Sequence, residues 1–198
     1  MLFDLSKDIT QTETYKLMSQ TIIPRPIAWI VTQDNGIINI APFSYFIGLS
    51  SNPASVLVSI GHKADGTPKD TLANIRKHKK CTICMVEEKD LEKMHFSSKG
   101  LNKDESEAKE FNIETQTIIE DFPPMIKDVP TAYFCELNQE IDLGGGTTIP
   151  IVLNIKNIYI QDRIVTDKER LSISFKPVGR VGGSYAFCGE DIPAPKIP

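Results

Sequence analysis

Short apolar runs, separated by turn-forming residues, dominate the first third of the chain. Residues 27–32 and 37–42 are apolar enough to form strands, and they flank the dipeptide Asn35-Gly36. A type I′ turn needs a positive φ at both central residues, which Asn and Gly tolerate well. We therefore expect a β-hairpin, followed by a helical turn or loop over residues 43–50 and a third strand over residues 54–60.

The hydrophobic period becomes helical after residue 66. Thr67 suits an N-cap, Pro68 suits the first helical position, and Asp70 suits a capping-box acid. The sequence therefore predicts a helix that begins at Thr67.

The rest of the chain is again rich in strand patterns. We expect strands over residues 81–87, 113–120 and 131–143, a turn over residues 144–150, and one long strand or two over residues 151–165. Two further helices are predicted, around Thr14–Met18 and within the acidic segment 103–111, whose charged face we expect to be solvated. Residues 178–198 are rich in Gly and Pro, which predicts irregular structure.

Strands separated by turns, with about three inserted helices, indicate a mainly β protein with an antiparallel barrel, because parallel sheets require alternating strands and helices. The sequence shows no internal repeat and no linker that would divide it. We expect residues 1–198 to form a single domain.

Composition narrows the possible partners. The 198 residues are 40% hydrophobic and 24% charged, with a formal net charge of -4. This is ordinary for a soluble globular protein and argues against nucleic acid or an anionic membrane as the main partner. No secretion signal or membrane-length apolar run is present, so we expect a cytoplasmic protein.

The cysteines and histidines do not form a recognisable catalytic or metal site. We expect Cys81, Cys84, Cys135 and Cys188 to be free thiols, and the first two to point to opposite faces of a strand, which is unsuitable for a shared metal. The histidines His62, His78 and His95 stand in unlike contexts, and we expect all three in loops or at the surface, with only His62 near a candidate binding site. We predict no catalytic side chain and no metal site.

Two glycine-containing segments resemble nucleotide-binding motifs, but each lacks a feature that its motif requires. Residues 61–66 have the glycine spacing of a phosphate-binding loop, but Thr67 and Pro68 stand where that loop requires Lys and Ser or Thr. Residues 178–187 lack the surrounding βαβ unit of a dinucleotide site. They indicate either a turn or backbone close to a flat ligand, with Arg180 and Tyr185 as candidate contacts.

A site for one phosphate group remains possible near the predicted helix start. Lys69 and Thr71 offer an ammonium and a hydroxyl beside the backbone N–H groups of a helix N-terminus, and each favours an anion. Ser50 and Ser51 offer two more hydroxyls upstream. The alternative is an ordinary capped helix with no ligand.

Taken in order, these segments resemble the flavin reductase-like family of FMN-binding split-barrel proteins, which includes flavoredoxin and the reductase components of two-component flavin monooxygenases. The resemblance is strong over residues 20–85 and looser beyond, where residues 178–187 resemble an Arg-x-Gly-Gly-x-x-Tyr motif. It rests on Arg25-Pro26, Asn39, Ala41-Pro42-Phe43-Ser44, Ser50-Ser51 and Lys69-Asp70-Thr71.

The resemblance implies a fold, a cofactor and a role for each motif. It implies a Greek-key split β-barrel that forms a homodimer and binds FMN. Ala41, Pro42 and Phe43 would face the flavin ring, with polar contacts from Thr32, Asn39 and Ser44. The phosphate would be held by Ser50, Ser51, Lys69 and Thr71, and Arg25 would either contact the flavin or pair with an acid.

The function implied is an oxidoreductase in which NADH or NADPH passes hydride to flavin N5, and electrons continue to free flavin, a small acceptor or a partner protein such as a monooxygenase. Three alternatives stay open: an FMN-binding electron carrier reduced by a partner protein, a pyridoxamine-phosphate-oxidase-like enzyme, and a barrel that binds no flavin. The second alternative needs a further basic cluster, and the basic run Arg76–Lys80 is better explained as a solvated helix end.

Overall fold

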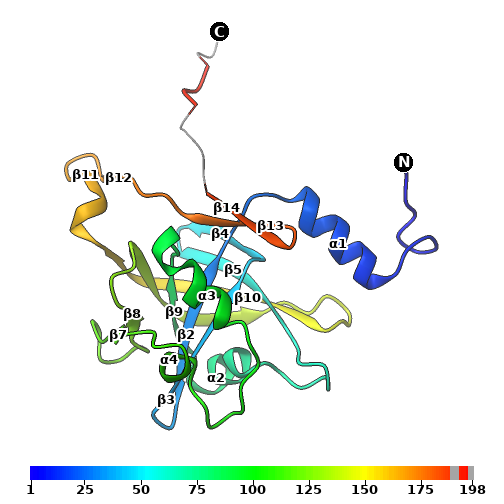
Figure 1. The fold of residues 1–198 in the computed structure, drawn as a ribbon, viewed down its shortest axis with the longest axis horizontal. Helices are drawn as coiled ribbons and strands as arrows, with labels where there is room; N and C mark the ends of the chain where they lie inside the picture. The colour runs from blue at the N-terminus through cyan, green and yellow to red at the C-terminus, as the bar shows by residue number, and fades with distance from the viewer. Residues whose placement is uncertain (188–191, 196–198) are drawn as a thin grey trace.

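The computed structural model describes residues 1–187 and 192–195, and its main element is an antiparallel sheet of seven strands (Figure 1). The strand order is β3-β2-β6-β9-β10-β5-β4. These strands are β2 (Ala28–Asp34), β3 (Ile37–Phe43), β4 (Phe46–Ser51), β5 (Ala54–Gly61), β6 (Lys80–Cys84), β9 (Thr131–Glu140) and β10 (Thr148–Ile160).

The sheet curls into an open barrel. Strands β3 and β4 end the sheet, and β3 also contacts β5 near the opposite edge. The neighbours β2–β6 and β10–β5 are not consecutive in sequence, so the chain crosses the sheet as in Greek-key topologies. The prediction of a mainly β protein with inserted helices is confirmed.

Strand β2 is buried on both of its faces. Ala28 and Ile30 point into the barrel interior, where they pack with Ile60 and Ile151 from the far side of the sheet. Trp29 points outward into a second cluster. A strand covered on both faces requires a continuous apolar run, which explains why this segment carries so few polar residues.

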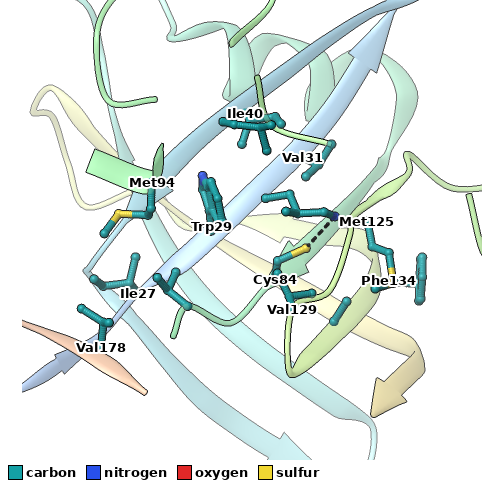
Figure 2. Close-up of a cluster of buried hydrophobic side chains, with 14 residues drawn as sticks. Ile27, Trp29, Val31, Ile40, Cys84, Met94, Met125, Val129, Phe134 and Val178 are labelled. Carbon is teal, nitrogen blue, oxygen red and sulfur yellow. Dashed lines mark hydrogen bonds between the residues drawn. The ribbon is translucent and has the colours of Figure 1, made fainter. Parts of the chain in front are cut away.

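The second cluster lies between the sheet and the inserted segments (Figure 2). Figure 2 shows Trp29 between Met94 of helix α3 (Leu91–Phe96) and Cys84 of β6. The cover also includes Ile113, Val129 and strand β8 (Met125–Ile126), which pairs with β7 (Thr115–Gln116). Leu91, which directly follows the one-turn helix η1 (Glu88–Asp90), packs against the same cluster. Cys81 lies in the interior cluster and Cys84 in the outer one, so the prediction that they face opposite ways is confirmed.

The predicted hairpin is confirmed, with φ of 49° at Asn35 and 80° at Gly36. It makes β3 an edge strand, whose outer backbone groups are then capped by side chains. The Ser106 hydroxyl donates to the Ile38 carbonyl (2.6 Å), and the Ile40 N–H donates to the Glu107 carboxylate (2.9 Å). Such capping keeps an exposed edge from pairing with another chain.

The acidic segment was predicted to present a solvated helical face, and this is wrong in one respect. Its helix, α4, spans only Glu107–Glu110, and Glu107 itself is buried against β3. Burial raises the pKa of the Glu107 carboxyl, and the hydrogen bond from Ile40 opposes that rise. The remaining acids of the segment are exposed.

The predicted start of the second helix is also wrong. Helix α2 spans Asp70–His78, its N-cap is Lys69, and no side chain caps it. The Thr67 hydroxyl is occupied by a 2.6 Å bond to Asp65, and Pro68 forms a β-bridge with His62. The chain is therefore still extended where the sequence pattern predicts the first turn.

Other segments differ in detail. Residues 43–50, predicted as a turn or loop, include most of strand β4, and the predicted strand 113–120 is reduced to β7. The segment 151–165 is one long strand, β10, followed by η2 (Asp162–Ile164) and the short pair β11 (Val165–Asp167) and β12 (Ser172–Ile173). Helix α1 (Gln11–Thr21) is longer than predicted, with a capping box formed by Thr10 and Glu13.

The C-terminal segment is more regular than expected. Strands β13 (Val178–Val181) and β14 (Ser184–Phe187) form a hairpin that pairs with β1 (Arg25–Pro26). Gly179 is required there, because a Cβ at this position would lie 2.8 Å from the Pro24 Cβ. Figure 1 shows this small sheet beside helix α1, above the main barrel.

Cys81, Cys84 and Cys135 are buried free thiols, and burial raises the pKa of Cys84 to about 12. Cys188 lies outside the described residues. Over the described part of the chain, no cluster of three or more His, Cys, Asp or Glu residues is placed to hold a metal, and no helix is long and apolar enough to cross a membrane.

Candidate functional site

A groove follows strand β3 and contains two adjoining cavities. Cavity A has a volume of about 450 Å³, and its lining includes Asn39, Ala41, His62, Lys69, Thr71 and Ser98. Cavity B has a volume of about 210 Å³, and its lining includes Pro42, Phe43, Ser44, His95, Arg180 and Tyr185. Ser98 lines both cavities, so they form one continuous surface.

Cavity A is rich in cationic side chains. Lys63, Lys69 and Lys99 line it together with His62. Lys63 is engaged by Asp70 at 2.9 Å, whereas Lys69 is exposed and forms no ion pair with the described residues. Its ammonium lies 5.7 Å from the centre of the Phe43 ring, at the junction with cavity B. Lys69 is therefore the lysine best placed to meet an anion.

A buried hydrogen-bond network forms the polar wall of cavity A. The Asn39 amide donates to Thr32 (3.3 Å) and to Thr71 (2.9 Å), and Asn74 donates to the same Thr32 oxygen (3.1 Å). Thr71 is thus an acceptor toward Asn39, and its own hydroxyl hydrogen has no acceptor among the described residues. Because an unused buried donor is costly, the network indicates a ligand acceptor at Thr71.

The start of helix α2 adds further donors to the same place. No side chain caps this helix, and its first residues Asp70 and Thr71 line cavity A. The N–H groups of a first helical turn lack intrahelical partners and attract anions. The Lys69 ammonium, the Thr71 hydroxyl hydrogen and the free N–H groups of helix α2 together suit a monophosphate.

An acidic cavity of about 340 Å³ adjoins cavity A beyond Asn39. Asp34, Asp104 and Glu105 line it, and it shares Asp70 and Glu107 with cavity A. Carboxylates repel a phosphate. An anionic group in the groove would therefore bind on the lysine side of Asn39.

Cavity B is lined by both apolar and polar side chains. Phe43 is buried and Pro42 half-buried among them. The Arg180 guanidinium lies 4.6 Å from the centre of the Tyr185 ring, and the Tyr185 hydroxyl lies 2.8 Å from His95 Nδ1. Cavity B therefore combines apolar and aromatic side chains with one guanidinium.

The structure brings together most of the residues predicted from the sequence to bind the cofactor. Lys69, Asp70 and Thr71 line cavity A with Asn39 and Ala41, while Pro42, Phe43 and Ser44 line cavity B. Thr32 is fully buried behind Asn39 and acts through it. Pro26 is exposed on β1, where it pairs with Gly179, and lines neither cavity.

Ser50 and Ser51 are not brought to the same place as Lys69 and Thr71. They are exposed at the end of β4, where Ser50 lies opposite Ser55 of β5. His62, which lines cavity A, is seven residues further along that strand, a span of roughly 20 Å at the usual rise per residue. Within one chain, these serines and cavity A cannot hold the same phosphate.

Arg25 neither lines a cavity nor pairs with an acid among the described residues, so both expectations for it need correction. It is buried, and its guanidinium donates to the Ile22 carbonyl at 3.0 Å and to the Ser19 carbonyl at the end of helix α1. Its Nε lies 3.4 Å from the Ser44 hydroxyl. Arg25 therefore links the C-terminus of helix α1 to Ser44, which follows β3. Its positive charge is favourable there, because the C-terminus of a helix carries partial negative charge.

Sequence reasoning missed several residues that line the groove. His95 is exposed, as expected, but its place in the lining of cavity B and its bond to Tyr185 were not predicted. Ser98 was not predicted, and Glu107 was predicted to be solvated. These residues reach β3 from distant segments, and no local spacing in the sequence could have identified them. The basic run Arg76–Lys80, as expected, stays out of both cavities, and Arg76, Lys77 and Lys80 pair with acids.

Comparison with known proteins identifies the family. A family model described as "Flavin reductase like domain" matches residues 18–171, which include β3, α2 and all the lining residues of cavity A. The chain belongs to the flavin reductase-like domain family. A relative from Bacillus subtilis, YwrF, is 30% identical over 191 residues, which cover 92% of this chain and 93% of the relative.

Two solved structures share 26% sequence identity with the chain. The 2-nitrobenzoate 2-nitroreductase NbaA of Pseudomonas fluorescens matches with a TM-score of 0.88 and covers 100% of this chain and 96% of its own. Component B of nitrilotriacetate monooxygenase from Bacillus cereus matches with a TM-score of 0.87 and covers 98% of both chains.

A third structure establishes the barrel type. A Shewanella frigidimarina protein with a split barrel domain matches with a TM-score of 0.79 over 99% of this chain and 100% of its own. Its sequence identity is 20%, so the likeness concerns the fold alone. The split barrel predicted for this flavin reductase-like protein is confirmed.

Proposed function

We propose that this flavin reductase-like protein binds FMN in the groove along β3 and acts as an NAD(P)H-dependent oxidoreductase. The observation that carries the proposal is the donor set of cavity A. Lys69, the Thr71 hydroxyl and the uncapped start of helix α2 all line cavity A, and such a donor set fits the single phosphate of FMN. The apolar stretch Ala41–Phe43 continues from cavity A toward cavity B.

The protein's part in this function is binding and orientation. When bound, FMN supplies the redox chemistry, accepting a hydride from the nicotinamide nucleotide. Lys69 and Thr71 hold the phosphate, and Asn39 orients Thr71. Ala41 in cavity A and Phe43 at its junction with cavity B provide an apolar surface for one side of the ring, which leaves cavity B free at the end of the groove. This arrangement needs no general acid or base for hydride transfer, in keeping with the sequence prediction.

The relatives support two destinations for the electrons. A monooxygenase component among the similar structures supports delivery to a partner protein, and a nitroreductase supports direct reduction of a small acceptor. We propose both as acceptor classes for the chain.

We also propose that the protein acts as a homodimer. Ile47 and Leu49 are exposed on the edge strand β4, next to Ser50 and Ser51. Exposed apolar side chains on an edge strand favour burial against another chain. In a dimer, the two serines would be free to contact the flavin of the partner subunit, which they cannot reach at cavity A of their own chain.

The test of the proposed function is the visible spectrum of the purified protein, with and without added FMN, before and after anaerobic NADH or NADPH. We expect a bound-flavin spectrum that bleaches with at least one donor. A bound flavin that does not bleach would show an electron carrier instead of a reductase. Absence of any FMN binding would refute the proposal altogether.

A further inference from the structure

Cavity B contains an arginine whose hydrogen-bonding capacity is largely unused. Arg180 donates through Nε to the Gly182 carbonyl at 3.0 Å and lies over the Tyr185 ring at 4.6 Å. These contacts orient the guanidinium. Its Nη1 and Nη2 groups form no hydrogen bond and no ion pair within residues 1–187 and 192–195. A planar fork with two free N–H groups is the geometry that binds a carboxylate.

A second arginine, Arg25, which is buried where Arg180 is half-buried, adds to the positive charge. Arg25 lies directly opposite Arg180 in the pairing of β1 with β13, and it is only 4% exposed. Its Nη2 atom is buried and has no partner in the described structure. Like charges placed opposite each other on adjacent strands destabilise the sheet. A bound anion beside this pair would offset that cost.

The rest of cavity B suits a single flat ring. Its described lining contains no Asp or Glu, and Ile27, Phe43 and Met94 give it apolar surface. Tyr185 stands edge-on to His95, with ring centres 5.8 Å apart, and the 2.8 Å bond between them fixes the Tyr185 ring. The volume of about 210 Å³ is below the roughly 300–1,000 Å³ typical of drug-sized ligands, so one ring fits and a dinucleotide does not.

We propose that cavity B is a specificity site for a small aromatic acid, a single ring that carries a carboxylate bound by Arg180. The proposal rests on the proposed function, because it names the substrate class that binds at the end of the flavin groove. Arg25 holds the β1 end of the site in place and adds positive potential. The His95–Tyr185 pair positions the aromatic wall.

The test is calorimetric titration of the FMN-loaded protein with benzoate, and with benzamide as a neutral ligand of the same shape. We expect saturable benzoate binding that is at least about tenfold tighter than benzamide binding, since the loss of a charged hydrogen bond costs about that factor. Arg180→Met should weaken benzoate binding about 10- to 100-fold and leave benzamide binding little changed. Arg180→Lys should fall between, because it keeps the charge and loses the fork.

The matched control is Arg170→Met, which removes the same charge from an exposed turn outside both cavities. It should bind benzoate as the wild type does. Equal binding of benzoate and benzamide, or unchanged benzoate binding in a folded Arg180→Met variant, would overturn the proposal. Displacement of FMN by benzoate would also overturn it, by showing that cavity B belongs to the flavin itself.

Nicotinamide mononucleotide serves as a third probe. If it excludes benzoate and loses affinity in Arg180→Met, cavity B is the electron-donor site, and the aromatic-acid assignment is wrong. The same titrations can be made on flavin-free protein. A chain that binds benzoate through Arg180 and fails to bind FMN would refute the proposed function and leave this site standing.

Discussion

Replacement of Lys69 by Met tests the phosphate end of the groove most directly. Lys69 is exposed, forms no ion pair with the described residues, and lines cavity A beside Thr71. Removing its ammonium therefore deletes a contact to the ligand and leaves the fold largely unaffected. A hydrogen bond to a charged group is worth about 1.5–3 kcal/mol, and solvent exposure of Lys69 reduces this to about 1–2 kcal/mol. FMN should bind about 5- to 30-fold more weakly.

The assay compares two flavins that differ only in the phosphate. Dissociation constants for FMN and riboflavin are measured by flavin fluorescence for wild type and Lys69→Met. The two proteins and two ligands form a thermodynamic cycle that isolates the contact between Lys69 and the phosphate. Riboflavin lacks the phosphate, so its affinity should change less than about twofold. The FMN effect should also shrink as salt is added, since exposed charges are screened. Lys168→Met, at an exposed site outside both cavities, is the matched control.

An equal loss of affinity for both flavins would refute this reasoning. It would mean that Lys69 acts on the ring end of the ligand, through its 5.7 Å contact with the Phe43 ring, rather than on the phosphate. Unchanged affinity for FMN would remove Lys69 from the site. Thermal unfolding of Lys69→Met checks that the variant is folded. The lost contact with the Phe43 ring is worth only about 0.5–1 kcal/mol at an exposed position, so the stability of the variant should change little.

Three further predictions concern the scaffold of the groove. Gly179→Ala should lower the free energy of unfolding in urea by about 1–3 kcal/mol, because the new Cβ would lie 2.8 Å from the Pro24 Cβ; unchanged stability would contradict this close approach. Ser97→Ala should cost about 1–3 kcal/mol in the same assay, because it leaves the buried Trp29 indole N–H without its 2.9 Å partner; an equal effect of Ser97→Ala in a Trp29→Phe background would argue against this reason. Burial raises the pKa of Glu107, so the folded protein takes up this proton at higher pH than the unfolded chain does. The free energy of unfolding of the wild type should therefore rise relative to that of Glu107→Gln as the pH falls from neutral toward 4.5, the ordinary pKa of a glutamate. A parallel pH dependence of the two proteins would contradict this.

Local patterns in the sequence predicted the features that local physics determines. The Asn35-Gly36 turn follows from the φ values that these two residues tolerate, and the strand predicted over residues 27–32 follows from its apolar run. The helix start failed for an equally local reason. Thr67 has the right chemistry for an N-cap, but its hydroxyl donates to Asp65, two residues upstream, in a turn that the helical period does not reveal. The helix itself begins three residues after Thr67, at Asp70.

The lining of the groove was predicted in part, along the segments where the candidate residues are neighbours in sequence. Residues 39–44 and 69–71 meet because β3 runs past the start of helix α2, and each segment contributes as a block. Ser50 and Ser51 show the limit of this reasoning. They follow the same motif order, but β4 turns away along β5, and only the strand register shows at which end of β5 they lie.

The groove exists because edge strand β3 is covered by side chains instead of by another strand. Its outward Ile38 carbonyl and Ile40 N–H are taken by Ser106 and Glu107, and the next outward position is Pro42, which has no N–H to offer. Strand pairing is thereby blocked along this edge, while the faces beside it stay open as the two cavities. A strand in the same place would fill the groove. The split in the barrel is therefore a structural requirement of the proposed binding site, and the acidic segment maintains it through Ser106 and Glu107, although its charges suggest only a solvated surface.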